Sequence, residues 1–111
     1  MDIVLPLSSA VFYILVSLAE GERNGAAITR EVENLTGGAV TLAPGTLYRL
    51  VKQLVSDGWI EDAGGDEADQ RRRYYRLTPR GRKVAALEAR RLEDLVRVAR
   101  ARRLLPATER V

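Results

Sequence analysis

Two groups of basic side chains have the types and spacing needed to bind a polyanion. Arg49 and Lys52 are three residues apart, which would place them one turn apart on the same face of a helix. Arg71, Arg72 and Arg73 are consecutive. Arginine offers a planar fork of donors that suits phosphates and guanine edges, and lysine adds a compact positive charge. Both groups therefore predict contact with a nucleic acid, although solvated charge on an ordinary surface would give a similar pattern.

Thr46 and Tyr48 belong to the same segment as Arg49 and Lys52 and can add hydroxyl groups to that surface. The Tyr48 ring is expected at the edge of the apolar face, where it can pack while its hydroxyl reaches a phosphate. Packing alone explains Tyr48 equally well. Gly45 and Thr46 would also leave backbone N–H groups free at the helix start, which attracts phosphate. A plain capping turn is the alternative.

The arginine run follows an acidic loop and leads into a segment that alternates like a strand. Successive strand residues point to opposite faces. One face would hold Arg72, Tyr74 and Arg76, and the core-facing side would hold Arg71, Arg73, Tyr75 and Leu77. Acidic residues of the loop would repel a phosphate backbone. We therefore expect phosphate or minor-groove contact from Arg72 and Arg73, at the arginine end of the loop.

The two signs of charge are separated along the 111 residues. Residues 1–70 hold four basic and 11 acidic side chains, a net charge of −7, and residues 71–111 hold 14 basic and four acidic side chains, a net charge of +10. Sixteen of the 18 cations are arginine. An arginine-rich half raises the expectation of a nucleic-acid partner, because charge bears on partners rather than on fold.

The composition removes most enzymatic chemistry. With no Cys and no His, the chain has no thiolate nucleophile, no imidazole base, no disulfide and none of the usual zinc ligands. We expect no catalytic residue, no metal and no cofactor. The apolar run over residues 11–19 is too short to span a bilayer, and no basic region precedes it as in a signal peptide. A cytoplasmic protein without membrane contact is expected.

Apolar periodicity and terminal signals predict four helices. The first spans about residues 9–20, with Ser8 or Ser9 as N-cap and Gly21 as its stop. The second covers residues 26–35 and ends at Gly37 and Gly38, and the third begins after Pro44 and ends at Gly58. Thr78 followed by Pro79 begins a last helix of about 26 residues.

Strand signals are confined to short segments. Residues 39–42 suit a small extended segment, while residues 59–61 and 73–77 suit a hairpin. The connection over residues 62–72 is polar and glycine-containing, so it should be a long, exposed and mobile tip.

The order helix, helix, helix, hairpin, long helix is that of a winged helix, a mainly α fold with a small β-hairpin. In such domains the third helix enters the major groove and the hairpin tip lies along the phosphates. We assign residues 1–78 to a winged-helix DNA-binding domain and residues 79–111 to a C-terminal dimerisation helix, the two forming one compact unit.

The last helix carries an apolar stripe that a domain this small cannot cover along its whole length. The stripe consists of Val84, Leu87, Leu92, Leu95, Val96, Val98 and Ala99. Burial against a second copy is the simplest solution, so a homodimer is expected. A helix folded back on its own domain is the alternative.

The chain resembles PadR-type transcriptional regulators, in the shorter branch with one C-terminal helix. The residues that carry the resemblance are Leu42, Ala43, Pro44, Gly45, Thr46, Leu47, Tyr48, Leu50, Leu54, Gly58, Trp59 and Ile60, followed by Arg72, Arg73, Tyr74, Tyr75, Arg76, Leu77, Thr78 and Gly81. The sequence departs at Asn24, Gly25 and Ala26, where such proteins commonly have His, Gly and Tyr. The single tryptophan lies in the first wing strand, so the resemblance does not extend to drug sensing through a tryptophan of the last helix.

The resemblance implies a homodimeric regulator, with a repressor as the expected form, that binds a pseudo-palindromic operator in double-stranded DNA. A small-molecule effector is a feature of similar proteins, and this sequence does not specify one. Two other classes of protein remain as alternatives. One is a helical protein-interaction module that never binds DNA. The other is an enzyme, which is disfavoured because Glu31 and Glu33 have no acid or base partner beyond ordinary helix surface.

Overall fold

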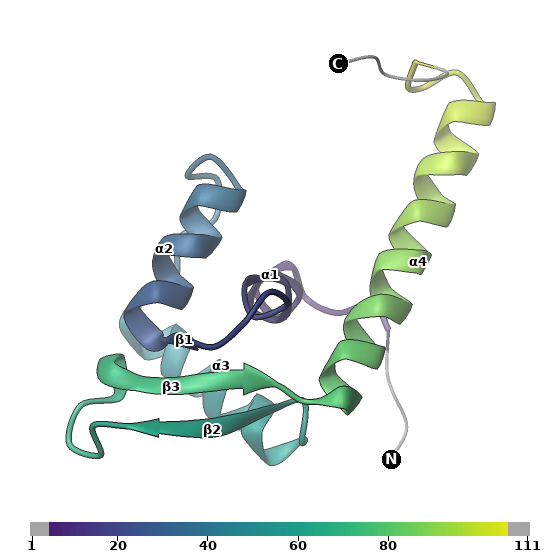
Figure 1. Cartoon of the computed structure of the whole chain (residues 1–111). Helices are drawn as coiled ribbons and strands as arrows, with labels where there is room; N and C mark the ends of the chain where they lie inside the picture. The colour runs from purple at the N-terminus through teal and green to yellow at the C-terminus, as the bar shows by residue number, and fades with distance from the viewer. Residues whose placement is uncertain (1–4, 107–111) are drawn as a thin grey trace.

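The computed structural model describes residues 5–106, without the side chain of Gln70. The elements in order are α1 (Ser9–Ser17), β1 (Arg23–Asn24), α2 (Gly25–Leu35), α3 (Pro44–Ser56), β2 (Ile60–Gly65), the short 3₁₀ helix η1 (Gln70–Arg72), β3 (Arg73–Leu77) and α4 (Pro79–Ala101). Three helices and a small sheet form the body, and α4 extends away from it (Figure 1). Residues 1–4, where a signal peptide would begin, and residues 107–111 of the predicted dimerisation segment lie outside this range.

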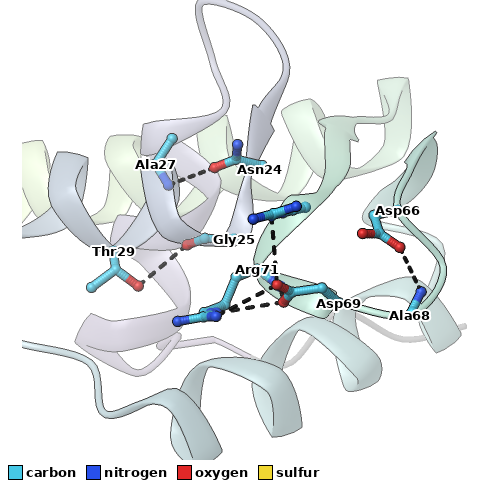
Figure 2. Close-up of polar contacts among 9 residues, drawn as sticks. Asn24, Gly25, Ala27, Thr29, Asp66, Ala68, Asp69 and Arg71 are labelled. Atoms are coloured by element: carbon cyan, nitrogen blue, oxygen red, sulfur yellow. Dashed lines mark hydrogen bonds and ion pairs between the residues drawn. The ribbon is translucent and has the colours of Figure 1, made fainter.

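Side-chain caps fix the start of three helices. The Ser8 hydroxyl accepts a hydrogen bond from the Val11 N–H at 3.2 Å, and the Thr78 hydroxyl accepts one from the Gly81 N–H at 3.0 Å. These contacts confirm Ser8 as N-cap and Thr78–Pro79 as the start of the last helix. Asn24 caps α2 through the Ala27 N–H at 2.8 Å (Figure 2).

Glycine after the last turn ends α2 and α3, as predicted. At the end of α3, Gly58 has φ +77°, and the Trp59 N–H reaches the Leu54 carbonyl at 3.0 Å. This is the Schellman arrangement, which favours glycine because it needs a left-handed residue. In α4 the same arrangement uses Arg103, at φ +64°, with the Leu104 N–H donating to the Ala99 carbonyl at 2.9 Å. The helix therefore ends at Ala101, earlier than the predicted 26 residues.

The first helix is also shorter than predicted. It ends at Ser17 rather than near residue 20, and the Ser17 hydroxyl donates to the Ile14 carbonyl at 2.6 Å. A hydroxyl that bonds to the preceding turn competes with the helical backbone pattern.

The sheet has three antiparallel strands in the order β1-β3-β2, so the prediction of a simple hairpin was incomplete. Arg23 and Asn24, which lie outside the predicted strands, pair with Tyr75 and Tyr74 of β3. Residues 39–42, predicted as extended, form no strand, and Leu42 is buried in the core instead. Two residues are too few to show strand periodicity, so only the partner strand defines β1.

The wing, which is the hairpin formed by β2 and β3, is longer than predicted, and the loop at its tip is shorter. β2 continues to Gly65, which pairs with Arg73, and a bulge interrupts the register between Asp62 and Gly64. A Cβ at Gly65 would lie 2.4 Å from the Arg72 carbonyl oxygen, so only glycine allows this approach. Glycines that suggested a loop therefore belong to a bulged strand.

One apolar core joins the helices and the sheet. It consists of Ile14, Leu15, Leu18, Ile28, Val32, Leu42, Leu47, Val51, Leu54, Ile60, Tyr75 and Val84. Burial alternates along β3 as predicted, with Tyr75 buried and Tyr74 and Arg76 exposed. Arg71 and Arg72 lie in η1 and are both exposed, so the prediction that Arg71 faces the core is wrong, because the strand begins only at Arg73. Leu35 of α2 and Val55 of α3 are exposed. None of the helices within residues 5–106 has the length and apolarity to cross a bilayer.

Candidate nucleic-acid interface

The α3 helix presents a polar face opposite its buried one. Leu47, Val51 and Leu54 recur at helical spacing and are buried, which fixes the orientation of the helix. Arg49 and Lys52 consequently point outward, and both are exposed. Thr46, in the first turn, is half-buried.

The start of α3 lacks a side-chain cap. Its N-cap residue is Ala43, which makes no capping hydrogen bond, and Pro44 follows at the first helical position. The first backbone N–H groups of a helix have no partner within it, so an uncapped start leaves donors available to a bound anion.

An open groove of about 600 Å³ separates α3 from the wing. On the helix side it is lined by Tyr48, Arg49, Val51, Lys52 and Val55, and on the wing side by Asp62, Arg73 and Tyr75. The groove thus brings together four of the six predicted contact residues, Tyr48, Arg49, Lys52 and Arg73. Thr46 and Arg72 do not line it. Tyr48 packs against the core while it also lines the groove, so the predicted packing is confirmed and the phosphate contact stays a prediction.

Arg73 is held inside the wing by a partner that the sequence did not suggest. Its Nε and one terminal nitrogen donate to the two carboxylate oxygens of Asp62 at 2.8 and 2.6 Å. Only 19% of the Arg73 side chain is exposed. The guanidinium, followed by the Gly64 N–H, lowers the pKa of the Asp62 carboxyl. Asp62 was assigned to a mobile loop, and only the continuation of β2 brings it beside Arg73.

Arg71 and Arg72 share a second carboxylate, Asp69, in the connection between β2 and β3. Asp69 accepts the Arg71 backbone N–H at 2.9 Å, and its oxygens lie 3.4 Å from the Arg71 Nε and 3.7 Å from the Arg72 Nε (Figure 2). The Arg71 N–H, then its guanidinium, lower the pKa of the Asp69 carboxyl. Arg72 is 73% exposed and its ion pair is long, so it is the more accessible of the two predicted wing arginines.

Arg76 ties the sheet to the body of the domain. It donates to Glu61 on β2 and to Glu22 before β1, both at 2.8 Å. All four arginines of this region therefore have a carboxylate partner, and the acidic residues offset much of the local positive charge.

The predicted dimerisation residues fall into two groups along α4. Val84 is completely buried in the core of its own chain and is not available to a second chain, so its predicted place on a dimer surface is wrong. Leu87, Leu95, Val96 and Val98 are exposed, and Leu92 and Ala99 are half-buried. The reason is geometric: α1 packs against the first half of α4, while the second half extends beyond it (Figure 1).

Comparison with known proteins decides the family. The family model described as "Transcriptional regulator PadR-like family" matches residues 14–87 of this chain. The chain belongs to that family. The residues that carried the PadR resemblance all lie within the matched range. PadR-like proteins are regulators of transcription rather than enzymes, so the regulator class predicted from sequence is confirmed.

Individual relatives agree with this membership. The PadR-like chain is 35% identical over 85 residues to "Transcriptional regulator Rv3488" from Mycobacterium tuberculosis, which covers 77% of each chain. It is similar to the structure of a transcriptional regulator from Clostridium thermocellum, with 30% identity, a TM-score of 0.69 and coverage of 82% of this chain and 89% of the other. A MarR family regulator from Neisseria meningitidis, NMB1585, matches with 26% identity and a TM-score of 0.61 over 86% of this chain and 62% of its own. The winged-helix fold is therefore confirmed.

Proposed function

We propose that this PadR-like chain is a sequence-specific DNA-binding regulator that places α3 in the major groove. The observation that carries the proposal is the groove in which Arg49 and Lys52 of α3 face the wing. Arginine and lysine can read guanine edges in the major groove, while the uncapped start of α3 offers backbone donors to a phosphate. Thr46 and Tyr48 would add hydroxyl contacts, and Arg72 the wing contact to phosphate.

The active form in this proposal is a homodimer joined through the second half of α4. Leu95 and Val98 are more than half exposed on a single chain, and Leu87 and Val96 extend the same apolar surface. An isologous contact would bury this surface in both copies at once. Two copies of α3 would then occupy successive major grooves about 34 Å apart, which requires a pseudo-palindromic operator. Repression by occupancy of that operator is the proposed outcome.

Replacing Arg49 and Lys52 together by alanine tests DNA binding separately from assembly. Affinity for a DNA fragment from upstream of the protein's own coding sequence should fall at least about 30-fold, because two base or phosphate contacts are lost. The mass measured by light scattering should stay unchanged. A double replacement of Arg90 and Arg97 by alanine removes the same charge from exposed positions of α4 and should have a much smaller effect.

The protein-interaction module, predicted as the alternative, gives a different result. The unmodified protein would then show no salt-dependent DNA binding, and replacing Arg49 and Lys52 would not change its DNA affinity. A footprint of the unmodified protein then tests the operator. Protection of two half-sites about 10 base pairs apart is expected, and a single protected half-site would contradict the dimeric arrangement.

A further inference from the structure

A carboxylate lies among the cations of the proposed DNA-binding groove. Asp62 lines this groove together with Arg49, Lys52 and Arg73. Its side chain is 41% exposed, so its charge is not hidden from a molecule that enters the groove. A phosphate backbone placed there would meet three cations and one anion.

The contact between Asp62 and Arg73 occupies the donors that a phosphate would use. Two parallel N–H···O bonds of 2.8 and 2.6 Å join the guanidinium to both carboxylate oxygens. Carboxylate and phosphate accept this bidentate fork in the same way. A phosphate can engage the same edge of Arg73 only after Asp62 has been displaced, and the displaced carboxylate would then repel it.

We propose that Asp62 is an internal competitor for phosphate, which holds Arg73 within the wing and so weakens sequence-independent DNA binding. This inference rests on the proposed DNA-binding function. Sequence-independent affinity comes almost entirely from phosphate contacts, whereas base contacts from α3 are made only at a matching site. An arginine withheld from phosphates therefore penalises binding to arbitrary DNA.

Asp62→Asn tests the proposal with little change in local structure. The asparagine keeps an oxygen that can accept the Gly64 N–H, which Asp62 accepts at 2.8 Å, but it loses the charge that holds Arg73. Affinity for a mixed-sequence duplex should rise about fivefold at moderate salt, the scale of one exposed ion pair. The slope of log affinity against log salt should steepen by about 0.9, the value for one added phosphate contact.

Asp66→Asn is the matched control. Asp66 lies in the loop directly after β2, and its side chain accepts the Ala68 N–H at 2.9 Å, a contact that asparagine can keep (Figure 2). This change removes one negative charge, as Asp62→Asn does, but it does not release Arg73. The increase in affinity for the mixed-sequence duplex should therefore stay below about twofold. In an Arg73→Gln background, the gain from Asp62→Asn should drop to the level of this control.

Three results would overturn the proposal. An equal rise in DNA affinity for Asp62→Asn and Asp66→Asn would show that net charge alone explains the effect. A rise for Asp62→Asn that persists in the Arg73→Gln background would show that Arg73 is not involved. A loss of affinity for Asp62→Asn would mean that Asp62 positions Arg73 for contact. Urea unfolding checks that each variant folds, and Asp62→Ser replaces Asp62→Asn if that variant does not. Absence of salt-dependent binding by the unmodified protein is a separate outcome, which rejects the DNA-binding function itself.

Discussion

At Gly81, near the start of α4, the helix approaches the backbone of Trp59, the residue before β2, too closely for any side chain. A Cβ there would lie 1.8 Å from the Trp59 carbonyl oxygen, which also accepts the Thr78 N–H at 3.1 Å. Gly81→Ala should therefore lower the free energy of unfolding by about 3 kcal/mol or more, measured by urea denaturation. Gly45→Ala is the control, because nothing lies within 4 Å of the added methyl. Alanine in that helical position should be neutral or stabilising.

Glu88 couples the segment before α1 to α4 through a buried carboxylate. Its oxygens accept the Leu7 N–H at 2.9 Å and the Arg91 guanidinium at 2.6 and 3.1 Å. The Arg91 hydrogen bonds, and then that of Leu7, lower the pKa of the carboxyl. A pKa lower in the folded than in the unfolded state stabilises the fold above about pH 4, and this contribution is lost as the pH falls further.

Glu88→Gln should therefore unfold more readily than the unmodified protein at pH 7, and the difference should shrink below about pH 4. Thermal denaturation measured across that range checks the expectation. Glu93→Gln, exposed on the same helix, changes the net charge equally and should follow the unmodified protein. A difference for Glu88→Gln that stays constant with pH would show that the ionised carboxylate is not responsible.

At the scale of elements, the helix starts are unequal. α1, α2 and α4 each have a side-chain cap, whereas α3 begins at Ala43 without one. Ala43 already has the extended backbone of an N-cap, with φ −63° and ψ 148°. Ala43→Ser should raise the free energy of unfolding by about 0.5–1 kcal/mol in urea denaturation.

The α2 helix supplies the reverse experiment. Asn24→Ala removes an existing cap and should cost about 1 kcal/mol in the same assay. If Ala43→Ser stabilises the protein but weakens DNA binding, the serine hydroxyl is occupying donors proposed to face a phosphate. A serine that leaves stability unchanged would show that the first turn of α3 is not limited by its missing cap.

At the scale of the whole molecule, the second half of α4 exposes apolar side chains that a single chain does not bury. Leu95→Lys places a charge in the centre of the proposed dimer surface and should raise the dimer dissociation constant at least about 100-fold, measured by analytical ultracentrifugation. Operator affinity should fall with it. Glu93→Lys introduces the same residue two positions away, on the opposite side of the helix, and should leave the dimer intact. Dimers that survive Leu95→Lys would place the interface elsewhere.

The sequence by itself determined the order of the four helices and the β2–β3 hairpin, the caps at Ser8 and Thr78, the end of α3 at Gly58 and the inward position of Tyr75. Caps and helix ends depend on contacts within about five residues, and apolar periodicity records which face of an element is covered. Because these signals lie within short segments, they can be recognised in the sequence without knowledge of the tertiary structure.

Only the tertiary structure decided the pairing of β1 with β3, the burial of Val84 and the contact of Asp62 with Arg73. Each of these depends on segments that are distant in sequence. Asp62 and Arg73 are 11 residues apart, and a bulged strand must continue past two glycines before they meet. Val84 has the same residue type as the exposed Val98, and only the position of α1 along α4 distinguishes them. Packing between elements assigns such residues to the core or to the surface, because the pattern within one helix is the same for both.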